Sequence, residues 1–190
     1  MTSWDRGRWL NPPPAAEVDG DDLLVTAARG SDLWQHTSYG FRRDSGHALL
    51  EPVARDRAVE VVLVVTARDT FEQAGLLLRL DEQRWVKAGV EHSDGVLQLS
   101  AVVTSGTSDW STAPVPSWAD RAVTVRASLG QDAVTVRARV DDEPFRLVRL
   151  APLPVEGALL AGPYCCAPET EGFRTRFTGW SVTAADERLH

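Results

Sequence analysis

Residues 73–104, QAGLLLRLDEQRWVKAGVEHSDGVLQLSAVVT, decide the fold because they contain three alternating segments separated by two short turns. The first turn is the polar DEQR at residues 81–84, and the second is Asp94-Gly95. Asp-Gly between alternating segments favours a type I′ turn, since both central residues of that turn need a positive φ. The stretch therefore predicts three consecutive antiparallel strands.

The Asp94-Gly95 turn also sets the register of the second hairpin. It pairs Ser93 with Val96, Glu91 with Gln98, Gly89 with Ser100 and Lys87 with Val102. Because neighbouring side chains on a strand point to opposite faces, this register sorts the stretch into two faces. One face is apolar throughout and comprises Ala74, Leu76, Leu78, Leu80, Val86, Ala88, Val90, Leu97, Leu99, Ala101 and Val103. The other face is largely polar and comprises Gln73, Leu77, Arg79, Trp85, Lys87, Glu91, Gln98, Ser100, Val102 and Thr104. We predict that the first face is core and that the second, called here the polar face, is a candidate working surface.

The rest of the chain supplies strands that can cover the apolar face. Strands are predicted at residues 23–28, 47–52, 57–68, 122–129, 133–140, 144–150, 159–166 and 172–183, with an edge strand at most in residues 4–14. Residues 30–46 are predicted to form a structured surface loop and residues 106–116 a loop around Trp110. No helical period of 3.6 residues continues long enough to indicate a helix. The sequence predicts an all-β fold, a two-sheet antiparallel β-sandwich, in a single domain over residues 1–190.

Composition narrows the class of protein. The net charge of −7 argues against a sequence-independent nucleic-acid binder, which needs a basic surface. The N-terminus lacks the basic and apolar regions of a signal peptide, and the longest apolar stretch, residues 58–67, is too short to span a bilayer. Cys165 and Cys166 are adjacent, so we expect two reduced thiols in a strand rather than a disulfide framework. These features predict a cytoplasmic protein without a membrane partner, and the Ala, Arg and Val content with one Lys indicates a high-GC bacterial source.

Seven segments in the same order carry a resemblance to one family. They are WLNPP (9–13), GSDLWQHT (30–37), YGFRRDSGH (39–47), QAGL (73–76), WVKAGVE (85–91), SDWS (108–111) and GPYCCAP (162–168). With them the chain resembles the domain-of-unknown-function family that includes the yeast regulation-of-enolase protein. The resemblance implies a concanavalin A-like lectin/glucanase sandwich, a jelly roll, and it implies a metabolic-enzyme partner as one function. It implies no reaction and no cofactor.

The first candidate site is the polar face. In lectin- and glucanase-like sandwiches an aromatic ring stacks on a sugar while charged and amide groups bind its hydroxyls. We expect Trp85 to stack, and Lys87, Glu91, Arg79 and Gln73 to form the hydrogen bonds. The alternative is a solvated sheet face stabilised by cross-strand pairs worth roughly 0.2–1 kcal/mol each.

The second candidate is the loop at residues 30–47. Sugar contact is expected from Trp34, Tyr39 and Arg43, whereas His36, Asp44 and His47 have the side chains of metal ligands or of an acid–base set. The spacing does not fit a metal, because no His-x-His or His-x₃-His occurs and no Cys is near, and a Ca²⁺ site from Asp32 and Asp44 has no recognisable motif. We predict no metal. The alternative is a loop whose aromatic residues pack over the sandwich edge.

The third candidate is the segment 108–111. Trp110 would form one wall of a cleft over the polar face, with Asp109 beside it. The alternative, which the sequence favours slightly, is a tight turn in which Asp109 caps its neighbours and Trp110 fills the core.

Glycoside hydrolysis needs two carboxylates, about 5–5.5 Å or 6.5–9.5 Å apart. Only Glu91 faces outward from the expected strand, and Asp44 or Asp109 would have to supply the second carboxylate from a loop. No Gly-x-Ser-x-Gly and no phosphate-binding loop occurs. We therefore predict that the protein binds a carbohydrate or sugar-like small ligand, with a weak glycoside hydrolase and a regulatory module for a metabolic enzyme as alternatives.

Overall fold

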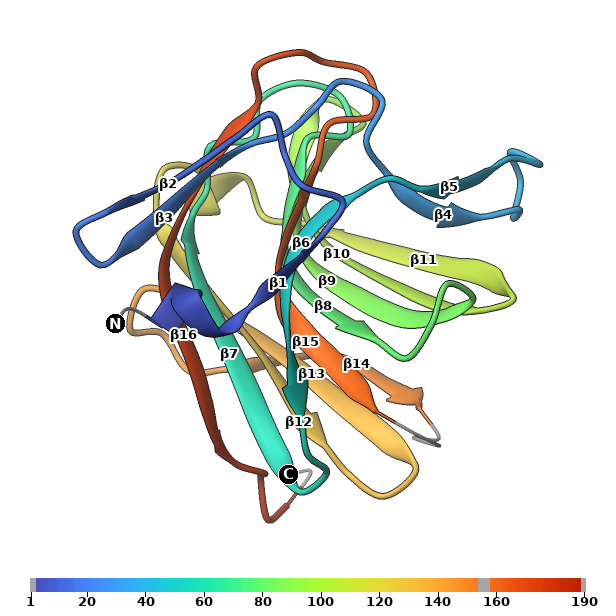
Figure 1. Cartoon of the computed structure of the whole chain (residues 1–190), viewed down its shortest axis with the longest axis vertical. Helices are drawn as coiled ribbons and strands as arrows, with labels where there is room; N and C mark the ends of the chain where they lie inside the picture. The colour runs from blue at the N-terminus through green and yellow to red at the C-terminus, as the bar shows by residue number, and fades with distance from the viewer. Residues whose placement is uncertain (1–2, 154–157, 189–190) are drawn as a thin grey trace.

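Two antiparallel seven-stranded sheets pack face to face in the computed structural model, which describes residues 3–153 and 158–188 (Figure 1). The first sheet has the order β1 (Arg8–Leu10), β6 (His47–Val53), β15 (Leu159–Cys166), β8 (Gln73–Arg79), β9 (Arg84–Ser93), β10 (Val96–Ser105) and β11 (Thr107–Pro114). The second has the order β14 (Arg146–Pro152), β13 (Ala133–Val140), β12 (Ala122–Leu129), β7 (Arg57–Val64), β16 (Arg174–Ala184), β3 (Asp22–Thr26) and β2 (Ala15–Asp19). A separate hairpin pairs β4 (Leu33–Gln35) with β5 (Arg42–Asp44). Two short 3₁₀ helices, η1 (Ser3–Arg6) and η2 (Pro116–Trp118), are the helical segments of the described residues. The predicted β-sandwich is confirmed.

The hairpin of β9 and β10 has the predicted register. Ser93 pairs with Val96, and Glu91 pairs with Gln98. The turn residues Asp94 and Gly95 have φ values of 53° and 76°, as a turn with two positive φ angles requires. The predicted apolar face lies in the main core, in contact with the inner face of the second sheet. Alternation in this stretch therefore determines which side of the first sheet becomes the interior.

Three segments differ from the prediction. Most of the expected loop at residues 106–116 is strand β11 (Thr107–Pro114), which pairs with β10 along its whole length after a turn at Gly106. The segment looked like a loop because an edge strand has one partner and can remain polar on both faces. The expected loop at residues 30–46 contains β4 and β5, and the unpredicted strand β2 is exposed at every residue. Neither β11 nor β2 carries the apolar alternation that reveals a half-buried strand.

The hairpin β4–β5 covers part of the polar face of the first sheet (Figure 1). Its backbone is anchored at Gln35, whose N–H donates to Ser108 Oγ at 2.9 Å and whose side-chain amide donates to the Glu82 carbonyl at 3.0 Å. A second, smaller apolar cluster fills the space beneath it and comprises Leu33, Trp34, Ala48, Leu50, Leu77, Trp85, Val102, Tyr164 and Cys166. The polar face is therefore neither a solvated surface nor a fully open one.

Two sequence predictions on smaller features can be compared directly. Cys165 and Cys166 are free and buried in β15, as expected for two thiols in a strand. In the part of the chain that the structure describes, no helix has the length and apolar character needed to cross a membrane.

Candidate functional site

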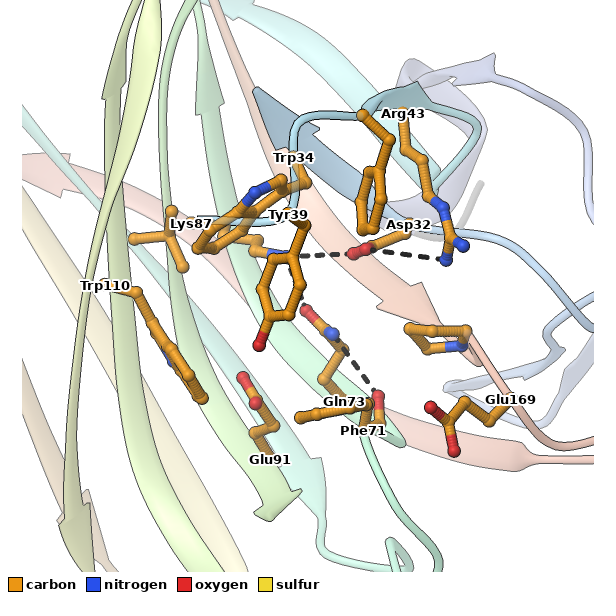
Figure 2. Close-up of a pocket in the computed structure, with 13 residues that line it drawn as sticks. Asp32, Trp34, Tyr39, Arg43, Phe71, Gln73, Lys87, Glu91, Trp110 and Glu169 are labelled. Carbon is orange, nitrogen blue, oxygen red and sulfur yellow. Dashed lines mark hydrogen bonds and ion pairs between the residues drawn. The ribbon is translucent and has the colours of Figure 1, made fainter. Parts of the chain in front are cut away.

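A cavity of about 200 Å³ remains between the hairpin and the polar face (Figure 2). Strands β8 and β9 supply its floor, and the hairpin, β10, β11 and the segment after β15 supply its walls. Its lining comprises Asp32, Trp34, Tyr39, Phe41, Arg43, Phe71, Gln73, Lys87, Glu91, Val102, Trp110, Pro168 and Glu169. Aromatic rings thus face buried polar groups across one small space.

The floor contains a buried cation held by two neighbours. Lys87 is 3% exposed, and its Nζ donates to Gln73 Oε1 at 2.7 Å and to Asp32 Oδ1 at 3.4 Å. Asp32 also lies 4.0 Å from the guanidinium of Arg43, and it accepts the Leu33 N–H at 2.8 Å. These contacts join the start of the hairpin to strands β8 and β9 and fix the lysine below the cavity.

Glu91 is the second charged group of the floor. It is 4% exposed, and its Oε2 accepts a hydrogen bond from Ser100 Oγ at 3.0 Å. That hydroxyl in turn accepts the indole N–H of Trp110 at 3.1 Å. Burial raises the pKa of Glu91, while the nearby Lys87 and the Ser100 hydrogen bond act in the opposite direction.

The wall of the hairpin is a set of mutually packed rings. Trp34 meets Tyr39 and Trp110 edge-on, with ring centroids 5.6 Å and 6.3 Å apart. Tyr39 stacks on Phe41 at 5.4 Å, and the Arg43 guanidinium lies 4.3 Å from the centre of the Phe41 ring. Tyr39 is nevertheless 53% exposed, so part of this wall is accessible from solvent.

Two opposed glycines on β8 and β9 leave one position of the polar face without side chains. Gly75 and Gly89 are directly opposite each other on β8 and β9. A Cβ on Gly89 would lie 2.1 Å from the Ala74 carbonyl oxygen, and one on Gly75 would lie 2.2 Å from the Ala88 oxygen. The two backbones therefore approach too closely for any side chain, and no side chain stands beside Gln73 and Glu91 at this pair.

Two residues of the predicted polar-face site do not reach the cavity. Trp85 is 0% exposed and packs under the hairpin, so its predicted stacking role does not fit this structure. Arg79 forms a two-pronged ion pair with Asp44, at 2.6 Å and 2.8 Å, that ties β8 to β5. Both corrections have one physical cause, since the hairpin covers these two positions and the sequence did not show that cover.

Three further candidates lie outside the cavity. His47 is buried, with Nε2 accepting the Ala28 N–H at 3.0 Å and Nδ1 2.8 Å from the Asn11 carbonyl, so the ring serves the backbone. His36 is exposed in the hairpin turn, and Asp109 pairs with Arg149 at 2.8 Å. None of these three side chains lines the cavity. The residues that the structure does bring together from the prediction are Trp34, Tyr39, Arg43, Gln73, Lys87, Glu91 and Trp110.

The cavity is also lined by residues outside the predicted ligand-binding set. Phe41, Phe71, Pro168 and Glu169 were not candidates, whereas Asp32 was considered for a calcium site and Val102 was assigned to the polar face. Phe41 alternates with Tyr39 and Arg43, so the sequence pattern could have identified it as a cavity residue. Glu169 follows β15 in the chain, and the pairing of β15 with β8 brings that segment beside the cavity. The second carboxylates considered for hydrolysis, Asp44 and Asp109, are held by arginines outside the cavity, and Asp32 and Glu169 line it with Glu91. Among the described residues, no group of three or more His, Cys, Asp or Glu is arranged to hold a metal ion.

Solved structures define the class of this fold. A GH43 protein from Bacillus licheniformis matches with a TM-score of 0.75 and 11% identity, over 96% of this chain and 39% of that chain. At this identity the likeness shows the fold alone, which is the sandwich class that the sequence resemblance implied.

The chain belongs to the family described as "Protein of unknown function (DUF1349)", which matches residues 9–185. Regulation of enolase protein 1 of Saccharomyces cerevisiae is 36% identical over 183 residues, which cover 96% of this chain and 92% of that protein. The crystal structure of a functionally unknown protein from the same organism has a TM-score of 0.90 and 36% identity, over 96% of this chain and 98% of that chain. The family membership indicated by the seven segments is confirmed.

Proposed function

We propose that this protein binds a carbohydrate or a sugar-like small ligand in the cavity beneath the hairpin β4–β5. The observation that carries the proposal is the division of the cavity into aromatic walls and a buried polar floor. Pockets for drug-sized ligands usually measure about 300–1,000 Å³. A cavity of about 200 Å³ suits a smaller molecule, such as one sugar ring.

The two sides of the cavity have complementary tasks in such a complex. The rings of Trp110 and Tyr39 offer apolar faces for the C–H groups of a sugar. The Glu91 carboxylate offers an acceptor, because only its Oε2 accepts a hydrogen bond from the described residues. In this arrangement Trp110 takes the stacking task that the sequence had suggested for Trp85.

Isothermal titration calorimetry with a panel of mono- and disaccharides tests the proposal. Tyr39→Ala removes an exposed ring from the wall without opening the core, and we expect it to raise the dissociation constant about tenfold, which corresponds to about 1.4 kcal/mol. Phe145→Ala is the matched control, because Phe145 is a half-buried ring outside the cavity that contacts Arg139. If no sugar binds the unmodified protein, or if both variants weaken binding equally, the proposal is wrong.

A second candidate is binding to a metabolic enzyme, and one observation favours it. The yeast relative that is 36% identical is named for regulation of enolase. Analytical ultracentrifugation of this protein with purified enolase would reveal a complex as a faster-sedimenting species. A mixture that sediments as two unchanged components would exclude enolase as the partner. The cytoplasmic location and the single-domain organisation stay predictions of the sequence.

A further inference from the structure

The charged side chains around the cavity do not balance. Three carboxylates, Asp32, Glu91 and Glu169, line it with two cations, Arg43 and Lys87, which leaves one net negative charge. Asp32 lies within ion-pair distance of both cations. Among the described residues, neither Glu91 nor Glu169 has an ion-pair partner. The unbalanced negative charge therefore lies on carboxylates that line the cavity.

Glu91 is the deeper of these two carboxylates. It is 4% exposed, whereas Glu169 is exposed at the rim. A carboxylate taken out of water without a cation within ion-pair distance is destabilised, and the nearby Lys87 and one neutral hydroxyl compensate only in part. A positive charge delivered by a ligand would relieve that cost, so the apo protein is prepared for a cation at this point.

The walls favour the same kind of group. Trp34, Tyr39, Phe41, Phe71 and Trp110 surround the cavity, and aromatic faces attract ammonium groups through their π electrons. Figure 2 shows the Glu91 carboxylate directed into the cavity, toward the side that carries Trp110 and Tyr39. An ammonium group placed there would contact a carboxylate and an aromatic ring at once.

We propose that the preferred ligand is an amino sugar, bound with its protonated amine against Glu91 and the neighbouring rings of Trp110 and Tyr39. This inference rests on the proposed function, since it adds a charge requirement to a sugar-binding cavity. A hydroxyl at the same ring position can donate to Glu91 but cannot neutralise it. An N-acetylated amine keeps the ring and loses the charge, so it should bind like the neutral sugar.

The test compares matched sugars on matched variants at pH 6.5, where the amines are protonated. Titrations use glucosamine, glucose and N-acetylglucosamine, and then galactosamine with galactose. We expect each amino sugar to bind about tenfold more tightly than its neutral counterpart. Glu91→Gln should abolish that preference, because the amide oxygen can still accept a hydrogen bond but cannot neutralise an ammonium group. Glu171→Gln is the control, since it removes one exposed negative charge outside the cavity and should keep the preference.

Each outcome decides between the two proposals. Equal affinity for amino and neutral sugars overturns the amino-sugar inference and leaves the proposed sugar binding standing. An amino-sugar preference that survives Glu91→Gln, with circular dichroism showing a folded variant, also overturns the inference. If choline binds and no sugar does, both the sugar-binding proposal and the amino-sugar inference are wrong.

Discussion

Replacing Lys87 with methionine should destabilise the protein by about 3–5 kcal/mol, because it breaks the buried ion pair with Asp32 and removes the cation that acts on Glu91. Methionine keeps an unbranched stem of similar length, so the packing of the chain beneath the hairpin changes little. The lost contacts are the hydrogen bond to Gln73 at 2.7 Å and the pair with Asp32 at 3.4 Å. Asp32 retains Arg43 at 4.0 Å, whereas Glu91 loses the cation that lowers its pKa.

Because Lys87→Met affects Asp32 and Glu91 differently, the stability of a double variant provides a second test. Adding Glu91→Gln to Lys87→Met should recover about 1–3 kcal/mol, since Lys87 acts electrostatically on Glu91 and residues of one buried charged network couple by amounts of this size. Urea unfolding at pH 7, followed by circular dichroism, measures both values. Arg121→Met is the control, because its ion pair with Asp141 is at the surface and should contribute less than about 1 kcal/mol. A loss below about 1 kcal/mol for Lys87→Met, or no recovery in the double variant, would refute this account of the floor.

Two further predictions concern titrating groups. Because the pKa of Glu91 is raised above its ordinary 4.5 by burial, the folded state holds this proton more tightly than the unfolded state, so stability should fall as the pH rises from 4.5 through the folded-state pKa. Glu91→Gln should flatten that part of the curve of unfolding free energy against pH, and parallel curves for the two proteins would contradict the assignment. Burial raises the pKa of Cys165 to about 12, so iodoacetamide at pH 8 should leave the native thiols unmodified and alkylate both Cys165 and Cys166 in urea. Rapid alkylation of the native protein would show that the thiols are accessible.

The fold was predictable from residues 73–104 because its signals are local. Alternation assigns each side chain to a face, and Asp94-Gly95 sets the register, without reference to any distant segment. Strand β11 escaped detection because its pairing with β10 decides its conformation, and its own residues carry no apolar alternation. The sequence indicated the sandwich through its buried strands and not through its edges.

The site was predictable in part for a related reason. Sequence placed Gln73, Lys87 and Glu91 on one face correctly, since that follows from register alone. It could not show that the hairpin covers Trp85 and leaves Trp110 at the wall, because this depends on where the chain folds back over the sheet. The position of Glu169 could not be predicted either, because it depends on the pairing of β15 with β8, two strands that lie far apart in the sequence.

One wall of the cavity comes from a single continuous segment, the hairpin β4–β5, whereas the floor comes from residues that are dispersed along the sequence. Trp34, Tyr39, Phe41 and Arg43 come from ten consecutive positions, while the polar groups of the floor come from strands that also build the interior. Changes in this one short segment can therefore alter the shape of the cavity without disturbing the two sheets. On the proposed function, we expect an exchange of residues 34–43 between family members to transfer ligand choice, while the charged groups of the floor stay in place. The residues that shape this wall therefore lie within one short stretch of the chain.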